Sequence, residues 1–239
     1  MVKWAVSQET LSATVLLALQ SVPALKRGRS IARETNRVVA APSISIDQAK
    51  QFLPPSICAM IDLQIFTAMR PQEVCGMRLI DIDMSDKEVW VYEPAMHKTA
   101  YRGTRRIIYL GPKCQAIIKP FLNRQATENL FTPAEAKKQM NTKRRGDVEA
   151  PRTNKGYEQK YHPFYSTPSY RKAVRRACIK AGIDIWSPNQ LRHYAKDILE
   201  KDFGVEIAAA VMGHNDVTTT KLDGEKQLQR AREVAKNRA

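Results

Sequence analysis

The sequence predicts an α+β fold that is predominantly helical and holds one small antiparallel sheet. Most of the chain places its apolar residues at helical spacing, and several of these stretches begin with a capping residue followed by proline. Three segments near the middle of the chain are instead short and rich in β-branched and aromatic residues, as strands are. With 239 residues, 43% of them hydrophobic, the chain suffices for one large domain or two small ones with a real core.

The N-terminal part of the chain differs in character from the rest. Within residues 7–25 the apolar residues from Leu11 to Val22 have a helical period, so we expect a helix that stops near Pro23. Lys26–Pro42 follows, with five basic residues, one acid and no clear periodicity, which is typical of a basic linker. Ser45, with glutamine three residues later, has the spacing of a capping box and predicts the start of a new helix. We therefore divide the chain into residues 1–42 and a second domain of residues 43–239.

The second domain is expected to combine helices with the small sheet. Residues 136–160 form a polar, mostly basic stretch that is too long for a plain connection. Helix starts are expected at Thr167 and Ser187, each a capping residue followed by proline. The strands are expected over residues 79–84, 88–93 and 105–111, and the remaining helices over residues 55–69, 71–79, 112–123, 204–213 and 225–239.

The chain is strongly basic. Lys plus Arg number 39 against 24 Asp plus Glu, which gives a net charge of +15 and a pI near 9.8, so a polyanionic partner is the simplest interpretation. No apolar run approaches the roughly 20 residues that cross a bilayer, and the N-terminus lacks the pattern of a signal peptide, which predicts a cytoplasmic protein. The cysteines are scattered singly, so we expect them to be reduced and mostly buried, with no structural zinc; they are Cys58, Cys75, Cys114 and Cys178.

Four residues far apart in the chain are candidates for chemistry on a phosphate. Arg70 precedes a proline that disfavours helical geometry, so its guanidinium is expected on a turn. Lys98 lies between two of the predicted strands, and Arg192 lies near the start of a helix whose free N–H groups favour an anion. His214 follows a glycine that closes a helix. Taken singly, each is better explained as an ordinary surface, salt-bridged or capping residue.

Together, the order and spacing of these motifs resemble a known family. "AMRPQEV" followed by "LIDID", a lysine between strands, "LRH", a later Gly-His pair and a threonine-rich turn are similar to the catalytic domain of the tyrosine recombinases, the phage integrase family. The resemblance covers roughly residues 43–239 and implies the DNA breaking–rejoining fold of that family. It further implies a set of side chains that bind one DNA phosphate while a tyrosine attacks it and forms a 3′-phosphotyrosyl intermediate. Carried over by motif, that set is Arg70, Lys98, Arg192 and His214.

The set suits the transfer of a phosphodiester. Two forked guanidiniums meet both non-bridging oxygens as charge builds on them. Lysine supplies a proton to the departing 5′ oxygen, and histidine bonds the phosphate or helps with proton traffic. This chemistry needs no metal and no nucleotide cofactor. The resemblance implies double-stranded DNA as a partner, together with other protomers of the same protein in a synaptic complex.

Two positions depart from the family pattern. Asn189 stands where the family usually has histidine; its amide can hold a phosphate oxygen but accepts no proton near neutral pH. Asp223 stands nine residues after His214, where the nucleophilic tyrosine is expected, and no tyrosine follows Tyr194. A carboxylate there is too short to replace a phenol oxygen, is repelled by the phosphate and would form an acyl phosphate. The chain as written is therefore predicted to be deficient in cleavage.

Other tyrosines offer weaker alternatives for the nucleophile. Tyr194 in a shifted register is conceivable, but it is expected to face the core from the helix that carries Arg192. An aromatic cluster in and after the polar stretch is expected to pack, or to contact DNA sugars, rather than to react. It consists of Tyr157, Tyr161, Tyr165 and Tyr170.

The resemblance also implies roles for the two ends of the chain. Residues 1–42 correspond to the end of a core-binding domain and its connector, so we expect most of that lobe to be missing. Residues 227–234 are expected to dock onto a neighbouring protomer. Four linker residues are expected to lie along the DNA backbone as sequence-independent contacts, the alternative being a merely solvated tether. They are Lys26, Arg27, Arg29 and Arg33.

Two other interpretations of the whole chain stay open. One is a DNA-binding module of the same fold that has lost its chemistry, which Asp223 favours directly. The other is a general basic nucleic-acid binder whose motif matches are accidental, which only the net charge favours.

Overall fold

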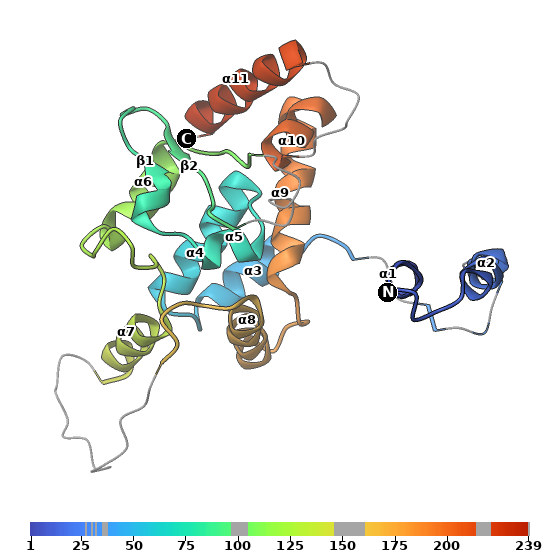
Figure 1. Ribbon diagram of the computed structural model, residues 1–239. Coiled ribbons are helices and arrows are strands. Elements are labelled where there is room, and N and C mark those ends of the chain that lie inside the picture. The colour runs from blue at the N-terminus through green and yellow to red at the C-terminus, as the bar shows by residue number, and fades with distance from the viewer. Residues whose placement is uncertain are drawn as a thin grey trace. The chain divides into compact units, whose positions relative to one another are not determined.

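The computed structural model describes residues 1–26, 28–29, 31, 33–34, 38–96, 105–145, 161–213 and 221–238, without the side chains of 143–145 and 221–227. Figure 1 shows the chain from its N-terminus to its C-terminus. It divides into two compact units, Met1–Val38 and Val39–Ala239, each of which is described by itself. None of the described helices is long and apolar enough to cross a membrane.

The first unit contains two short helices, α1 (Val2–Ser7) and α2 (Ala13–Ser21). α2 is the helix predicted from the apolar period of Leu11 to Val22, and it begins where the Ser12 side chain accepts the backbone N–H of Thr14; α1 was not predicted. The predicted stop is confirmed, since α2 ends just before the proline that follows it. Neither helix contains a buried residue.

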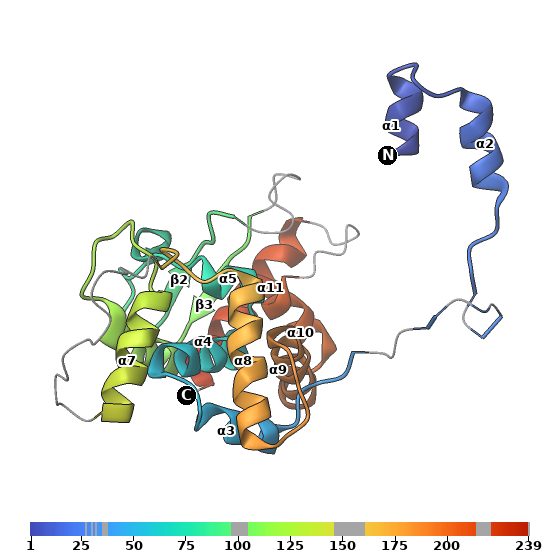
Figure 2. The same cartoon turned by 90° about the horizontal axis from the view of Figure 1, so that it is seen from below.

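The second unit is built around α4 (Pro55–Thr67), which has buried residues on most of its faces. Among the described residues, four other helices make most of the helix contacts with α4. They are α5 (Pro71–Cys75), α6 (Pro112–Ile118), α7 (Pro133–Arg145) and α9 (Pro188–Phe203). Figure 2 shows α4 lying between α7 on one side and α9 on the other. The main hydrophobic core therefore lies along α4.

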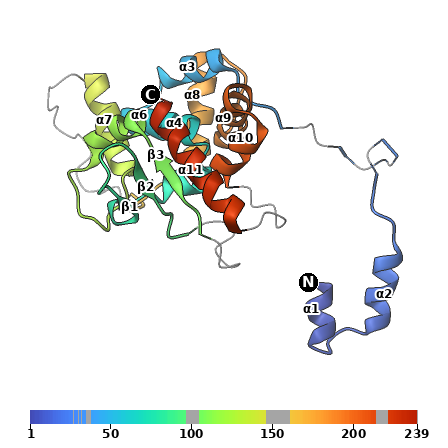
Figure 3. The ribbon, with the colours of Figure 1, turned by 90° about the horizontal axis from the view of Figure 1, so that it is seen from above.

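The remaining helices form the outer part of this unit. α3 (Ser43–Lys50) packs on α8 (Thr167–Ala181), and α10 (Val205–Met212) packs on α9. α11 (Lys221–Asn237) lies across the third strand of the sheet and beside α10, as Figure 3 shows. A second, smaller core joins α9, α10 and α11. Thus the segment expected to dock onto a neighbour is packed against its own domain in the single chain.

The sheet has three strands in the order β1–β2–β3, with both pairs antiparallel. The strands are β1 (Ile82–Asp83), β2 (Trp90–Tyr92) and β3 (Ile108–Leu110), with Tyr92 paired with Ile82 and Ile108. The predicted α+β, predominantly helical fold with a small antiparallel sheet is confirmed. Residues 79–81, expected as strand, instead form a short 3-10 helix before β1.

Several predicted helix boundaries were wrong by one to five residues. Ser45 lies inside α3, because the N–H of Ile46 already bonds to the carbonyl of Pro42 at 3.1 Å. Ser166, not Thr167, caps α8, since its side-chain oxygen accepts the N–H of Ser169 at 3.3 Å. The polar stretch begins as part of α7, and α11 begins earlier than expected. The Ser187 cap and the glycine that closes α10 are both confirmed.

Gly111 allows α11 to approach the sheet and generates a prediction about stability. A Cβ atom at Gly111 would lie 1.7 Å from the carbonyl oxygen of Ala235 in α11. Gly111→Ala should therefore push α11 outward and lower the free energy of unfolding by about 1–3 kcal/mol, measured by urea denaturation. Hydrogen exchange of the α11 amides should accelerate. Gly76→Ala is the matched control, because its Cβ meets only a backbone oxygen at 3.4 Å; equal losses in the two variants would contradict this account.

Candidate functional site

The first element of the site is an arginine held by a glutamate at the start of α5. Arg70 has an extended backbone, with φ −74° and ψ 152°, because Pro71 follows it. Its backbone N–H donates to Oε2 of Glu73 at 2.7 Å, and its Nη1 donates to Oε1 of the same carboxylate at 2.8 Å. The Glu73 side chain is fully buried, whereas that of Arg70 is 24% exposed. The guanidinium is thus fixed in place yet still accessible from solvent.

A second arginine, Arg106, reaches the same carboxylate from the segment that leads into β3. Its Nε lies 3.5 Å from Oε1 of Glu73, and its Nη1 donates to the carbonyls of Val211 at 3.1 Å and of Ile107 at 3.4 Å. The side chain is 5% exposed, and neither its Nε nor its Nη2 has a hydrogen-bond acceptor among the described residues, so the contact with Glu73 is an ion pair. Buried guanidiniums are uncommon, because a charge costs free energy to desolvate.

The sequence motifs did not predict a role for Arg106 or for Glu73. A faint signal existed for Arg106, because side chains alternate across a strand and one of two adjacent arginines entering β3 must point inward. Arg105 does point outward, with a side chain that is 73% exposed and an ion pair to Glu93. The sequence contains no comparable signal for Glu73, whose role depends on the tertiary contact with Arg106.

The third arginine, Arg192, joins the ends of two helices. Its Nη1 donates to the carbonyl of Ala68, and its Nη2 donates to the carbonyl of Met212 at 2.8 Å. Ala68 ends α4 in the left-handed conformation at φ 52°, and Met212 is the last residue of α10. The last carbonyls of a helix lack partners within it and carry partial negative charge, so a guanidinium satisfies them well.

The three arginines and Glu73 form an electropositive cluster. Burial, reinforced by the charges of Arg70 and Arg106, lowers the pKa of Arg192 to about 9, although Glu73 acts in the opposite direction. Burial likewise lowers the pKa of Arg106. Burial alone would raise the pKa of Glu73, but Arg106 and the hydrogen bonds from Arg70 outweigh it and hold that pKa below its usual value. Arg70 and Arg106 contact the Glu73 carboxylate, and Arg192 adds a third positive charge that interacts with them, so the cluster has an excess of positive charge and favours a further anion.

Hydrogen bonds from side chains to backbone carbonyls hold the surrounding segments in place beside the cluster. The buried Tyr92 hydroxyl of β2 donates to the carbonyl of Glu73 at 2.8 Å, which ties α5 to the sheet. Gln64 in α4 donates to the carbonyls of Met69 at 3.1 Å and of Pro188 at 3.4 Å. These bonds hold the residue before Arg70 and the first residue of α9 close to α4.

The structure brings two of the predicted catalytic residues, Arg70 and Arg192, into one cluster. Asn189 lies in the first turn of α9 and is exposed. Lys98 and His214 lie outside the described residues; His214 directly follows Gly213, which closes α10 at φ 64°. For Asp223 only the backbone is described, and it lies in the first turn of α11.

The other predicted residues differ in how exposed they are. Of the linker residues, Lys26, Arg29 and Arg33 are exposed, and Arg27 lies outside the described residues. Tyr194 is partly buried and packs against the main core, as expected. In the aromatic cluster, Tyr165 and Tyr170 are buried, Tyr161 is exposed at 38%, and Tyr157 is not among the described residues. Of the cysteines, Cys75, Cys114 and Cys178 are buried and Cys58 is partly buried.

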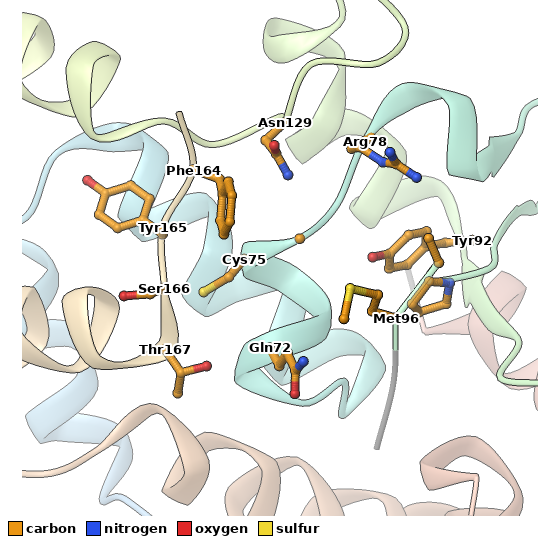
Figure 4. Close-up of a pocket in the computed structure, with 13 residues that line it drawn as sticks. Gln72, Cys75, Arg78, Tyr92, Met96, Asn129, Phe164, Tyr165, Ser166 and Thr167 are labelled. Carbon is orange, nitrogen blue, oxygen red and sulfur yellow. The ribbon is translucent and has the colours of Figure 1, made fainter. Parts of the chain in front are cut away.

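A cavity of about 430 Å³ lies on the other side of α5, and Figure 4 shows its lining. Gln72 and Cys75 of α5 face the segment Phe164–Thr167 across it. Its walls are largely apolar, and Arg78, the charged residue that lines it, is bonded to Asp81 at 2.8 Å. None of the clustered arginines lines this cavity, so the arginine cluster remains the candidate site.

The lowered pKa of Glu73 predicts how acid acts on the fold. In the unfolded chain the carboxyl has its usual pKa, so between the two pKa values the unfolded state binds more protons. The stabilisation by Glu73 is therefore complete above about pH 5 and is lost as the pH falls through the lowered folded-state value. Glu73→Gln should reduce the free energy of unfolding at pH 7 by on the order of 3 kcal/mol. It should also make the further decrease of this free energy below pH 5 smaller than in the parent, measured by urea denaturation at several pH values.

Glu93→Gln is the control for this experiment, because it removes a carboxylate from an exposed pair with Arg105, and such pairs contribute little. It should keep the acid dependence of the parent. An unchanged acid dependence in Glu73→Gln would show that Glu73 is not the charged centre of the cluster.

The sequence profile of the phage integrase family matches residues 44–222 and ends one residue before Asp223. A search of curated proteins found no match. Among solved structures, a lambda integrase dimer bound to a COC′ core site is similar with a TM-score of 0.56 and 15% identity, over 91% of this chain and 68% of that one.

Two further integrase structures show the same fold. The integrase of mycobacterium phage Brujita gives a TM-score of 0.53 at 15% identity, over 98% of this chain and 66% of that one. The Tn1549 transposon integrase with circular intermediate DNA gives 0.54 at 13% identity, over 96% and 84%. The profile match spans most of the chain, and the architecture is that of a tyrosine-recombinase catalytic domain: the chain belongs to the phage integrase family.

Proposed function

We propose that this chain is the catalytic domain of a site-specific DNA recombinase or integrase, which in its active form breaks and rejoins DNA through a 3′-phosphotyrosyl intermediate. The observation that carries the proposal is the convergence of Arg70 and Arg192, which lie far apart in the sequence, on one buried cluster with an excess of positive charge. A phosphodiester is an anion that two guanidiniums recognise well.

In this mechanism the arginines act on the phosphate in the transition state. As the nucleophile attacks phosphorus, charge grows on the non-bridging oxygens, and donors already fixed in position stabilise it without reorganisation. Arg70 is partly exposed and held by Glu73, so the rest of its guanidinium suits this role. Arg192 adds a second positive charge close to it.

Proton transfer and the remaining contacts are assigned to the other motif residues. Lys98 gives a proton to the 5′ oxygen as the phosphorus–oxygen bond breaks, and His214 bonds the phosphate or helps with proton traffic. Asn189, exposed in the first turn of α9, can donate its amide N–H to a phosphate oxygen but cannot act as a base. The proposed chemistry uses no metal ion and no nucleotide.

Asp223 makes the chain as written deficient in cleavage. In the active form a tyrosine oxygen bonds to phosphorus and the 5′ oxygen leaves with a proton. A carboxylate at this position is too short to reach phosphorus, is repelled by the phosphate and would give an acyl phosphate. A DNA-binding module of the same fold without chemistry is the second candidate function, and Asp223 is the observation that favours it.

Charge on the described surface supports double-stranded DNA as the partner. The outward face of α8, opposite its buried residues, carries several basic side chains and no acidic one, with Ile179 exposed among them. The basic side chains are Arg171, Lys172, Arg175, Arg176 and Lys180, all exposed. The linker adds Lys26, Arg29 and Arg33 and, in sequence, Arg27, and the lambda and Tn1549 integrase structures contain DNA. We further propose assembly with other protomers on DNA, and a cytoplasmic location where the DNA is accessible.

Restoring the nucleophile tests the cleavage chemistry. With a nicked suicide substrate, the chain as written should give no protein–DNA band that resists denaturation, whereas Asp223→Tyr should give one. Asp223→Phe is the matched control, because it fills a similar volume without the attacking oxygen, and it should give none. A covalent band from the parent would overturn the assigned deficiency. Absence of any covalent product from Asp223→Tyr, on DNA that it binds, would remove the support for a recombinase.

Removing two arginines of the cluster separates chemistry from binding. In the Asp223→Tyr protein, Arg70→Ala with Arg192→Ala should reduce the rate of covalent product formation by at least about 100-fold. DNA affinity at fixed salt should change little, because it is spread over many phosphate contacts. Lys137→Ala with Lys138→Ala removes the same charge from the exposed face of α7 and should leave the rate near that of its parent. Equal rates in the two double variants would contradict the assigned site.

A further inference from the structure

Arg106 is buried in the centre of the candidate site, yet no step of the proposed mechanism uses it. The structure assigns to Arg106 the role of a positioning residue: it fixes Arg70, through Glu73, relative to the end of α10, from which His214 follows. It does so without contacting DNA. This inference rests on the proposed function, and it adds a residue that the recombinase motifs in the sequence do not include.

Arg70 and Arg106 share one carboxylate, that of Glu73. Oε1 of Glu73 accepts from Nη1 of Arg70 at 2.8 Å and lies 3.5 Å from Nε of Arg106. Oε1 of Glu73 therefore lies next to two positive charges. A rotation of the carboxylate toward one guanidinium weakens its contact with the other. Because Oε2 also accepts the backbone N–H of Arg70, the orientation of the carboxylate sets the orientation of the Arg70 guanidinium.

Arg106 also contacts the end of α10. Nη1 of Arg106 donates to the carbonyl of Val211 at 3.1 Å. The backbone then passes so close that a Cβ atom at Gly213 would lie 2.4 Å from the same Nη1. Gly213 also has a φ of 64°, which favours glycine. The guanidinium thus sets how closely the backbone at the end of α10, just before His214, can approach Arg106.

Burying the charged side chain of Arg106 costs free energy. A buried ion pair is often no more stable than apolar residues of the same volume, and here part of the guanidinium has no hydrogen-bond acceptor among the described residues. An apolar side chain would fill this space at a lower cost of desolvation. What an apolar side chain cannot do is hold the Glu73 carboxylate and the Val211 carbonyl at once.

The test uses Arg106→Gln and Arg106→Lys in the Asp223→Tyr protein, with covalent complexes trapped by denaturant on supercoiled plasmid DNA. Glutamine removes the charge, and lysine keeps it but lacks the planar fork whose separate nitrogens face Glu73 and Val211 in Arg106. Both variants should form covalent product at least about tenfold more slowly than their parent. Arg105→Gln, at the neighbouring exposed position, is the matched control and should stay within about twofold.

Two further readouts distinguish positioning from general support of the fold. In a double-mutant cycle, the effects of Arg106→Gln and Glu73→Gln on the rate should be strongly non-additive, because both remove the same restraint on Arg70. In the chain as written, the side-chain Nε–H signal of Arg70 in ¹⁵N NMR spectra should be dispersed, should collapse toward the position of a free arginine in Arg106→Lys, and should be unchanged in Arg105→Gln. Thermal unfolding confirms that each variant compared is folded.

A rate for Arg106→Lys equal to that of its parent would overturn the inference, since charge alone would then suffice. Fully additive effects of Arg106→Gln and Glu73→Gln, or an Arg70 signal that is unchanged in Arg106→Lys, would overturn it as well. If Arg106→Gln does not fold, the lysine variant and the NMR comparison still decide. If Asp223→Tyr forms no covalent product, the proposed function fails, while the Arg70 signal of the unrestored chain still tests the role of Arg106.

Discussion

The buried carboxylate of Glu73 is the interaction on which the candidate site depends. Arg70, Arg106 and Arg192 carry like charges that interact with one another in a region largely shielded from water. At an effective dielectric constant of about 20, two unit charges 4 Å apart interact by about 4 kcal/mol, so three guanidiniums would not stay together without a counter-charge. Glu73 bonds Arg70 directly and lies next to Arg106. It offsets only part of the positive charge, and a phosphodiester anion would reduce the remainder.

The same arginines also hold helix ends, which makes the site inseparable from the fold around it. Arg106 and Arg192 bind the last carbonyls of α10, and Arg192 also binds the carbonyl that ends α4. These contacts border the smaller core, where residues of α9, α10 and α11 pack together with Ala68. A change in how α10 or α11 docks would therefore move the arginines, although neither helix contributes a described side chain to the cluster.

The sequence was informative where local rules decide the structure and uninformative where tertiary contacts do. The turn at Arg70 follows from the proline after it, the start of α9 follows from Ser187 and its proline, and the three strands follow from β-branched and aromatic residues. The cap of α8 was misplaced by one residue, because adjacent Ser166 and Thr167 are both good capping residues. Glu73 and Arg106 escaped prediction because their importance arises from a contact between segments distant in the sequence.

We propose that Arg70 and Arg192 bind one and the same phosphate. The most direct measurement is a crystal structure of this chain with duplex DNA, and the proposed deficiency in cleavage would keep that DNA intact. The account predicts one phosphate of the DNA within hydrogen-bond distance of both guanidiniums, with Glu73 still bonded to Arg70. A complex in which the DNA backbone lies elsewhere on the basic surface, with no phosphate within reach of either arginine, would contradict it.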